Sequence, residues 1–426
     1  MLRLGAIADD FTGATDLATS LRERGFRVAV LLGADALRSA TDDLAELDAV
    51  VVALKTRTIP AADAIAQSLA ALRGLAALDP EQYFVKYCST FDSTPAGNIG
   101  PVLDAVLDEV GERRTVVVPS FPDNGRTVVH GELFVNGEPL SDSPMRHHPL
   151  TPMTESRVAS ILQPQTTRTI GEVPVEVVRQ GPDAVRAALD ASSAAYLVVD
   201  ATTNAELQTV QAATRDWRVL SGSAGLAFGM RGEHDPASQR FDAPAGRRLV
   251  VCGSASAKTR AQIAHALASG AAGFKLDVDR AIAAPDAVVG EVAEWLAGLA
   301  EEAVPVVYSV ATLDDIRAGE AAAGPTAAEA VEAVLSRVVV EAVERLGVRR
   351  IVVAGGETSG AVATALGCAR LLIGPQLAPG VCWSLTRTGE AGGGAGRASG
   401  TEVALALKSG NFGADDLFIS AWEALS

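Results

Sequence analysis

The sequence contains few aromatic residues and few cysteines, and each shortage excludes a class of protein. Aromatic residues make up 4% of the 426 residues, so the buried cores must consist mainly of Ala, Val and Leu. The four cysteines lie far apart and form no CxxC pair: Cys88, Cys252, Cys368 and Cys382. This spacing excludes a zinc framework and a disulfide scaffold, and it suits a reducing compartment.

Positive charge is also scarce. The chain has 36 Lys and Arg residues against 52 Asp and Glu residues, which gives a net charge of −16 at pH 7. A nucleic-acid binder, or a protein that binds an anionic membrane surface, needs the opposite sign. No apolar run approaches the roughly 18 residues of a membrane-spanning helix, and no signal-peptide apolar region precedes Asp9. We therefore expect a cytoplasmic protein whose partners are small molecules, with no nucleic acid and no membrane.

The order of apolar and amphipathic segments predicts the fold class. A chain of 426 residues is longer than one compact core usually holds, so two domains are expected. Short β-branched runs such as DAVVVAL and TVVVP alternate with longer amphipathic segments, among them residues 60–78 and 326–346. This alternation is typical of βαβ units. We predict an α/β protein of two domains, each a largely parallel sheet flanked by helices.

Two segments interrupt the alternation. The run TVVHGELFVNGEPL predicts a β-hairpin excursion in the first domain, with a turn at Asn136–Gly137. The alternation then resumes with VEVV at residues 175–178, which we interpret as a strand. A polar, charged segment with prolines predicts a linker at residues 231–247. The first domain then spans residues 1–230 and the second spans residues 248–426.

Candidate site residues in the first domain follow its predicted strands. Asp9 and Asp10 come directly after the first strand, where ligands of open α/β sheets bind. Adjacent carboxylates there suit the hydroxyls of a polyol or Mg²⁺, although Asp10 has an alternative role as the cap of the following helix. Lys86 and Asp92 flank a cluster of hydroxyl residues after another strand, and Arg126 follows a third. A cation, a carboxylate and several hydroxyls form the mixture that binds a small hydroxy-carboxylate.

Two other groups of polar residues are weaker candidates. Lysine is rare, with five among 36 basic residues, so Lys55 in the run Lys55-Thr56-Arg57 is a second strand-end candidate. Arg146-His147-His148 resembles a pair of metal ligands, but adjacent side chains diverge and no third ligand is evident. We interpret these histidines as structural or substrate-facing, and we predict no protein-built metal site.

Three glycine-containing turns in the second half predict an anion site. Each follows an apolar strand: Gly253-Ser254-Ala255-Ser256, Gly355-Gly356-Glu357-Thr358-Ser359-Gly360 and Lys408-Ser409-Gly410-Asn411-Phe412-Gly413. Backbone N–H groups at a helix start attract phosphate, and three such turns indicate phosphate binding more strongly than one. The chain contains no GxxxxGK[ST] motif and no GxGxxG after its first strand, so a P-loop and a usual dinucleotide fold are unsupported.

Taken together, several blocks resemble one family along almost the whole chain. The blocks are IADDFTGATDLA, KYCSTFDSTPAGNIGPV, FPDNGRTV, MRHHPLTPMT, AGGETSGAV and ALKSGNFG. They resemble the four-carbon acid sugar kinase family, and the middle blocks are most similar to its 3-oxo-tetronate kinase branch. The glycine-rich insert at residues 392–396 is unusual for the family but lies between the motifs.

The resemblance implies a function and a set of roles. The first domain would bind the acid sugar, the second would bind ATP with its Mg²⁺, and the γ-phosphoryl group would pass to the C4 hydroxyl in the cleft between the domains. From the chemistry of this reaction and the positions after the strands, we predict Asp10, ahead of Asp9 and Asp92, as the general base, and Lys86, Asp92 and Arg126 as residues that bind the substrate. The predicted ATP-binding residues are Ser254, Ser256, Gly355, Gly356, Glu357, Thr358, Gly410 and Asn411.

Alternatives remain open at this point. Within the family, a D-threonate or D-erythronate 4-kinase would carry similar motifs. An NAD-linked acid-sugar oxidoreductase would share the α/β fold but needs a nicotinamide site, and a non-catalytic acid-sugar sensor would have no use for three phosphate-type turns. The stereochemistry of the acid and a homo-oligomeric state are also left open.

Overall fold

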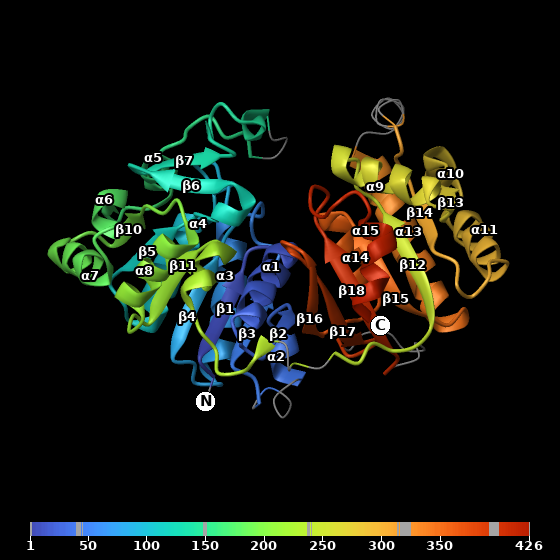
Figure 1. Cartoon of the computed structure of the whole chain (residues 1–426), viewed down its shortest axis with the longest axis horizontal. Coiled ribbons are helices and arrows are strands. Elements are labelled where there is room, and N and C mark those ends of the chain that lie inside the picture. Colours follow the sequence, from blue (N-terminus) through green and yellow to red (C-terminus); the bar gives the residue numbers. More distant parts are fainter. Residues whose placement is uncertain are drawn as a thin grey trace. The chain divides into compact units, whose positions relative to one another are not determined.

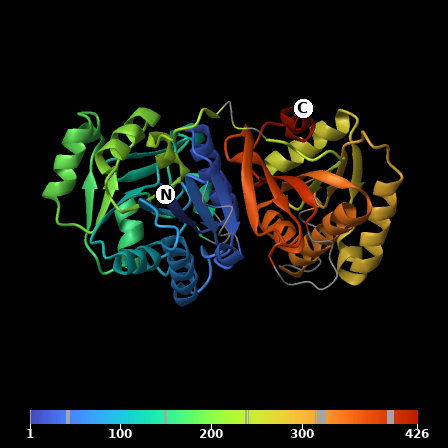
Figure 2. The ribbon, with the colours of Figure 1, turned by 90° about the horizontal axis from the view of Figure 1, so that it is seen from below.

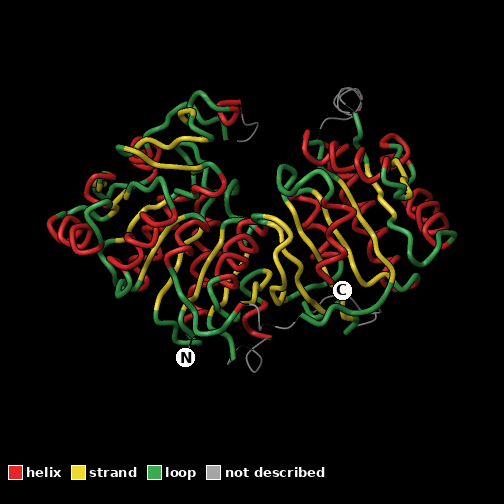
Figure 3. Tube along the Cα trace, in the orientation of Figure 1, coloured by secondary structure: helices red, strands yellow, loops and turns green. Residues whose placement is uncertain are grey.

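The computed structural model describes residues 2–39, 44, 46–147, 151–236, 239, 241–312, 315, 325–391 and 400–425. The chain forms two compact units, Met1–Gln239 (unit 1) and Arg240–Ser426 (unit 2), shown in Figure 1. Helices cover both faces of each unit's sheet in Figure 2, and Figure 3 shows how strands and helices alternate along the chain. Among the described residues, no helix is both long and apolar enough to cross a membrane.

Unit 1 contains a parallel sheet with the strand order β2-β3-β1-β4-β11-β5-β10-β9, in which neighbouring strands pair in parallel. Its strands are β1 (Leu4–Ala8), β2 (Val28–Leu32), β3 (Ala49–Ala53), β4 (Gln82–Lys86), β5 (Thr115–Val118), β9 (Ile170–Val173), β10 (Tyr196–Val199) and β11 (Val219–Gly222). The α-helices are α1 (Phe11–Glu23), α2 (Ala36–Ser39), α3 (Ala61–Ala76), α4 (Ile99–Val110), α5 (Val158–Leu162), α6 (Val175–Val178), α7 (Pro182–Ala191) and α8 (Asn204–Thr214). The 3-10 helices are η1 (Pro122–Asn124), η2 (Pro144–His147), η3 (Gln163–Gln165) and η4 (Ala224–Gly229).

The strand order brings distant segments together at one edge of this sheet. Strand β1 lies between β3 and β4, and its last residue, Ala8, is in register with Ala53 and Lys86. All three strands run parallel, so the segments that follow them leave the sheet side by side. The strands are continuous apolar runs because helices cover both faces, and β3, with the sequence AVVVA, is fully buried.

A separate three-stranded sheet confirms the predicted hairpin and extends it. Strands β6 (Arg126–Val129), β7 (Glu132–Val135) and β8 (Glu138–Pro139) pair antiparallel in that order. Asn136 and Gly137 both have positive φ, +52° and +88°, as the turn between β7 and β8 requires. The second hairpin of this sheet turns at residues 130–131, a turn that the sequence analysis did not identify.

The prediction of a strand at VEVV is wrong. Residues Val175–Val178 form the short helix α6, while the strand of this region is the preceding β9. Pro174 lies between them, and it has no N–H to continue the ladder of hydrogen bonds, so the strand ends there. The buried residues of α6 are Val175 and Val178, three positions apart, which is the spacing of one helix face.

Unit 2 contains a second sheet with the order β13-β14-β12-β15-β18-β17-β16. The pairs β13–β14, β14–β12, β12–β15 and β15–β18 are parallel, whereas β18–β17 and β17–β16 are antiparallel. The strands are β12 (Arg247–Cys252), β13 (Ala272–Lys275), β14 (Pro305–Tyr308), β15 (Val348–Ala354), β16 (Arg370–Ala378), β17 (Val381–Arg387) and β18 (Glu402–Lys408). The helices are α9 (Ala257–Ala268), α10 (Val278–Ala283), α11 (Pro285–Ala297), α13 (Pro325–Arg345), α14 (Gly356–Ala365), α15 (Leu417–Ser420) and the 3-10 helix η6 (Ala421–Leu425).

These two units confirm the predicted fold class, and they add one strand to it. Strand β17 is not part of the predicted alternation, and it carries the fully buried Trp383, whose Nε1 donates to the carbonyl of Ala421 at 2.9 Å. The glycine-rich insert at residues 392–396 lies outside the described residues.

Candidate active site

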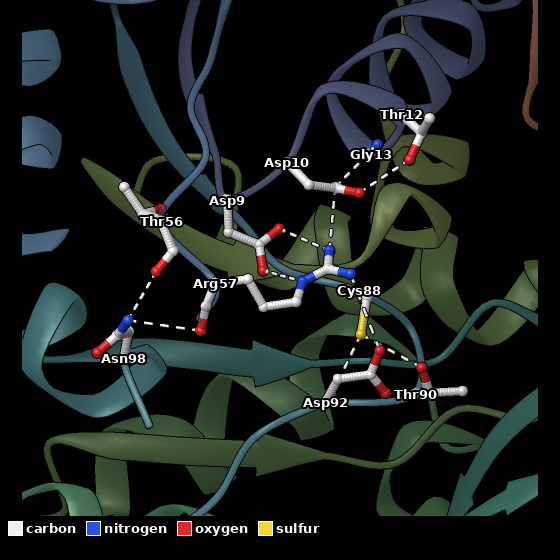
Figure 4. A network of polar contacts seen from close by, with 10 residues as sticks. All are labelled: Asp9, Asp10, Thr12, Gly13, Thr56, Arg57, Cys88, Thr90, Asp92 and Asn98. Atoms are coloured by element: carbon white, nitrogen blue, oxygen red, sulfur yellow. Dashed lines mark hydrogen bonds and ion pairs between the residues drawn. The ribbon is translucent and has the colours of Figure 1, made fainter. Parts of the chain in front are cut away.

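Arg57 is the centre of a polar network at the carboxyl edge of the unit 1 sheet (Figure 4). Its guanidinium donates two hydrogen bonds to Asp9, Nε to Oδ2 at 2.8 Å and Nη2 to Oδ1 at 3.0 Å. Nη2 is also 3.0 Å from Oδ1 of Asp10, and Nη1 is 3.8 Å from Oδ2 of Asp92. Burial lowers the pKa of Arg57, but Asp10 and Asp9 outweigh it and the pKa lies well above its ordinary value. Arg57 therefore holds three carboxylates from two other strand ends.

Asn98 supports the loop that carries Arg57. Its Nδ2 donates to the carbonyls of Thr56 and Ile59 at 2.6 Å and 2.8 Å, as Figure 4 shows for the first of these. Asn98 is buried at the start of α4, so this loop after β3 is tied to a helix from elsewhere in the unit. No motif in the sequence distinguished Arg57 from its neighbour Lys55. Lys55 is exposed, and its ammonium lies 5.3 Å from the centre of the Phe11 ring.

Asp10 caps helix α1. Its Oδ1 accepts a hydrogen bond from the N–H of Gly13 at 2.9 Å, and its Oδ2 accepts one from the Thr12 hydroxyl at 2.8 Å. Burial raises the pKa of Asp10, but Arg57 and Lys86 outweigh burial, so the pKa lies below its usual value. The structure therefore contains the capping arrangement, while the role of Asp10 or Asp9 as a general base stays a prediction.

Cys88, Thr90 and Asp92 form the far side of the network. The thiol of Cys88 accepts a hydrogen bond from the N–H of Asp92 at 3.2 Å and lies 3.2 Å from the Thr90 hydroxyl. Burial raises the pKa of Cys88 to about 12, so the thiol is neutral and unsuited to act as a nucleophile. A pocket beside these residues is lined by Asp9, Arg57, Lys86, Asp92 and Asn98, among others.

Several oxygens in this pocket lack a protein partner. Oδ1 of Asp92, Oδ1 of Asn98 and Oγ of Ser68 are buried, and none accepts or donates a hydrogen bond within the described part of the chain. A buried polar atom without a partner is costly, so such atoms point to a ligand or ordered water. The pocket is thus suited to a small molecule that carries hydroxyl groups.

Lys86 and Arg126 are cations that form no ion pair with a carboxylate of the described residues. Lys86 is 3% exposed, and its ammonium has neither an ion pair nor a hydrogen bond to the described residues. The Nε of Arg126 is buried and has no hydrogen-bond partner in the part of the chain that the structure describes, and its Nη1 donates to the carbonyl of Asn124. Burial lowers the pKa of Arg126 despite Cys88, Asp92 and Asp16 nearby. Aspartates lie near both cations, but no described carboxylate forms a direct ion pair with either, so the two cations can bind an incoming anion.

The three predicted glycine turns of unit 2 lie next to one another. They follow β12, β15 and β18, which are neighbours in the sheet. A Cβ placed on Gly410 would lie 2.3 Å from the Ser254 hydroxyl, and one on Gly355 would lie 2.9 Å from the Thr358 hydroxyl. Gly355 also has a φ of +134°, which L side chains rarely adopt. Glycine is therefore required at both positions by the close approach of the turns.

The helices that start at these turns differ in their caps. Ser256 caps α9, with its hydroxyl accepting from the N–H of Thr259 at 3.1 Å and donating to the carbonyl of Gly410 at 2.7 Å. Helix α14 begins after Gly355 with no side-chain cap within the described residues. The first N–H groups of an uncapped helix, together with its dipole, form an anion site.

The other residues predicted to bind ATP lie on the second and third glycine turns. Thr358 is buried, whereas Gly356, Glu357 and Asn411 are exposed at the surface of the turns.

Lys408 holds the third glycine turn, residues 408–413, in place through hydrogen bonds of its side chain. It is fully buried, and its Nζ donates to the Thr259 hydroxyl and to the carbonyl of Gly410, both at 3.1 Å. Burial lowers its pKa to about 8. The ammonium thus ties the end of β18 to the start of α9.

The Arg146-His147-His148 segment is only partly described. Nη1 of Arg146 donates to the carbonyl of Ser141 at 3.0 Å, and His148 lies outside the described residues. Across the described ranges, no group of three or more His, Cys, Asp or Glu side chains gathers in a way that could hold a metal ion.

Comparisons with known proteins assign the two parts of the chain to two kinds of domain. One family model, described as a sugar-binding N-terminal domain, matches residues 4–230, and another, described as a nucleotide-binding C-terminal domain, matches residues 249–418. A 3-oxo-tetronate kinase of Brucella melitensis is 42% identical, with 99% of this chain and 95% of that protein covered. One from Escherichia coli is 40% identical over 89% of this chain and 99% of that protein.

Solved structures show the same fold. A Salmonella typhimurium protein superposes with a TM-score of 0.87 at 39% identity, with 99% of both chains covered. A Haemophilus influenzae protein gives a TM-score of 0.79 at 36% identity, with 99% of this chain and 100% of that chain covered. The chain is therefore an α/β protein of the class that joins a sugar-binding domain to a nucleotide-binding domain. It belongs to the four-carbon acid sugar kinase family, which confirms the resemblance in its motifs.

Proposed function

We propose that this protein uses ATP to phosphorylate the terminal C4 hydroxyl of 3-oxo-tetronate, producing the 4-phosphate. The observation that carries the proposal is the identity of 42% with a 3-oxo-tetronate kinase over 99% of the chain. Two further features support the proposal independently. The cations Lys86 and Arg126 of unit 1, which form no ion pair with the described residues, suit a carboxylate, and the adjacent glycine turns of unit 2 suit phosphate.

Unit 1 binds the acid sugar in this proposal. Lys86 and Arg126 hold the carboxylate of the acid, because both are buried cations without an ion pair in the described chain. The partnerless Oδ1 of Asp92 accepts a hydrogen bond from a substrate hydroxyl. Arg57 keeps Asp9 and Asp10 in place through its Nε and Nη2 and forms a longer ion pair with Asp92.

Unit 2 binds ATP in this proposal. The uncapped N–H groups at the start of α14, next to Gly355 and Gly356, hold the phosphate oxygens, while Ser254 and Gly410 form the facing wall. Mg²⁺ would arrive with the nucleotide. The turns supply hydroxyl oxygens and the single carboxylate of Glu357, a donor set that fits a metal bound mainly by phosphate and water. When bound, Mg²⁺ neutralises charge on the phosphates.

Catalysis then rests on positioning and charge. Phosphoryl transfer leaves little covalent work for the protein, so fixing the hydroxyl in line with the phosphorus supplies much of the rate. Cations and backbone N–H groups that are already in place need no reorganisation when charge moves to the leaving ADP.

A coupled ADP-release assay over a panel of four-carbon acids tests the proposal. 3-Oxo-tetronates should give the highest kcat/KM, above D-threonate and D-erythronate. A preference for D-threonate or D-erythronate would show that the proposed substrate is wrong, while the proposed phosphorylation reaction would stand. Calorimetry with ATP and NAD⁺ decides the class: binding of NAD⁺ in place of ATP would indicate an oxidoreductase, and acid binding without any nucleotide binding would indicate a sensor.

A further inference from the structure

We propose that Asp16, and not Asp9 or Asp10, is the general base that accepts the proton of the substrate's terminal hydroxyl. The inference rests on the proposed function and assigns a role to a residue that the sequence analysis left without one. It follows from the face of α1 that carries Asp16, from the cations beside it, and from the partners that occupy the other aspartates.

Asp16 lies on the face of α1 that Lys86 approaches. A Cβ on Gly13 would lie 2.8 Å from Nζ of Lys86, so the ammonium occupies the space above Gly13. Residues three apart on a helix share a face, and Asp16 is therefore one turn further along from this ammonium. Glycine at position 13 is what lets a strand-end lysine come this close to the helix.

The Asp16 carboxylate has no partner within the described part of the chain. It neither accepts a hydrogen bond nor forms an ion pair, although Lys86, Arg126 and Asp10 are near enough to affect its charge. Asp9 and Asp10, by contrast, are bound to Arg57, and Asp10 also caps α1. The oxygens of Asp9 and Asp10 already accept hydrogen bonds that hold them in place and, at Asp10, lower its basicity, whereas those of Asp16 accept none from the described residues.

The electrostatics of Asp16 suit proton transfer. Burial raises its pKa to about 6, and Asp10 adds to the effect while Lys86 and Arg126 oppose it. The pKa of Asp10 is lowered instead, which makes Asp10 a weaker base. General bases work best with a pKa near the working pH, so Asp16 is ionised at pH 7 and still basic enough to take a proton.

The proposed step transfers the γ-phosphoryl group of ATP and moves one proton. The oxygen of the terminal hydroxyl forms a bond to the γ-phosphorus of ATP, the bond from that phosphorus to the bridging oxygen breaks, and ADP leaves with that electron pair. The hydroxyl proton passes to the Asp16 carboxylate and is released to solvent before the next turnover. Lys86 and Arg126 hold the carboxylate at the other end of the four-carbon acid.

The test compares Asp16→Asn with Asp10→Asn and with Asp183→Asn, an exposed aspartate on α7 that serves as the matched control. General-base catalysis contributes about 10²–10⁴-fold, so Asp16→Asn should lower kcat by at least about 100-fold. Calorimetric binding of ATP and of the acid should change little, because Asn keeps an oxygen that accepts hydrogen bonds. Asp183→Asn should behave as wild type.

Two further measurements separate a base from a structural residue. The acidic limb of kcat/KM near pH 6 should become shallower in Asp16→Asn, because the variant loses the ionisation of Asp16 and keeps only that of ATP, which affects both proteins equally. The folded protein also binds a proton on Asp16 up to about pH 6, whereas an unfolded Asp releases it near 3.8. Folding is therefore opposed by this charge above pH 6, and Asp16→Asn should raise Tm at pH 7.5.

Each other outcome overturns the inference. Near-normal kcat in Asp16→Asn, with a large loss in Asp10→Asn, would return the role to Asp10. A raised KM for the acid at unchanged kcat would make Asp16 a binding residue. If wild type releases no ADP with any four-carbon acid, the proposed function fails with it, and this is distinct from an active wild type whose Asp16→Asn variant is equally active.

Discussion

Arg126→Met separates a substrate-binding arginine from a structural one. Arg126 begins β6, and the Nε of its guanidinium is buried without a partner, while Nη1 donates to the carbonyl of Asn124. Methionine keeps most of the aliphatic bulk and removes the charge and the donors. Lys86→Met applies the same change to the other unpaired cation.

The structure sets the size and the direction of both effects. A charge-assisted hydrogen bond contributes about 1.5–3 kcal/mol, and each 1.4 kcal/mol is about tenfold, so KM for the acid should rise about 10- to 100-fold. KM for ATP should change little because the change removes contacts to one substrate only. Burial lowers the pKa of Arg126, and no ion pair to a described residue offsets that cost. The free energy of unfolding should therefore stay the same or increase.

Steady-state kinetics with each substrate varied in turn, together with urea unfolding at pH 7, measure these quantities. Arg57→Met is the matched control, since it removes the same group from a guanidinium whose Nε and Nη2 are bonded to protein carboxylates. Equal increases in both KM values for Arg126→Met, with a clear loss of stability, would refute its role in carboxylate binding.

The remaining predictions concern stability and nucleotide binding. Arg57→Met should lower the free energy of unfolding by about 3 kcal/mol at pH 7, since Asp9 and Asp10 lose their ion-pair partner. Arg57 holds the pKa of Asp10 below its usual 3.8, so urea titration should show this loss shrinking as the pH falls below 3.8 and Asp10 protonates. Gly356→Val should abolish ATP binding in calorimetry while the protein stays folded, because a Cβ there meets no atom within 4 Å; Gly290→Val, equally open, is the control, and unchanged ATP affinity would argue against the site. Lys408 has a pKa lowered to about 8, below the roughly 10.4 of unfolded Lys, so its contribution to stability should increase from pH 8 to pH 10. Lys408→Met should lack that increase in urea titrations, and parallel pH profiles for both proteins would contradict the prediction.

Local patterns in the sequence were enough to predict much of the fold. Runs such as AVVVA in β3 can be buried on both faces only in a helix-covered sheet, and the predicted helices at residues 60–78 and 326–346 correspond to α3 and α13. The turn at Asn136–Gly137 requires positive φ at both positions, which these two residue types adopt readily. Such features depend on a few neighbouring residues, so they can be read without the tertiary structure.

The sequence also indicated where polar groups leave the two sheets. Glycine turns after β12, β15 and β18 were visible as strand–glycine–helix patterns, and Asp9 and Asp10 as acids after the first strand. The resemblance to the acid sugar kinase family followed from several sequence motifs that occur in the same order along the chain. No local pattern predicted β17, because its residues pair antiparallel with strands on both sides and their burial depends on that position in the sheet.

The tertiary structure alone decided which charges meet. Arg57 is 48 residues from Asp9, and they pair because β3 lies beside β1, an order of strands that no local pattern encodes. The same network directs Asp10 to the start of α1 and leaves Asp16 with no partner among the described residues. Asp10 and Asp16 are the same residue type on one short stretch of the sequence. Nearby cations lower the pKa of Asp10, whereas burial raises the pKa of Asp16. Their chemical difference comes from desolvation and Coulomb interactions, which are properties of position in space.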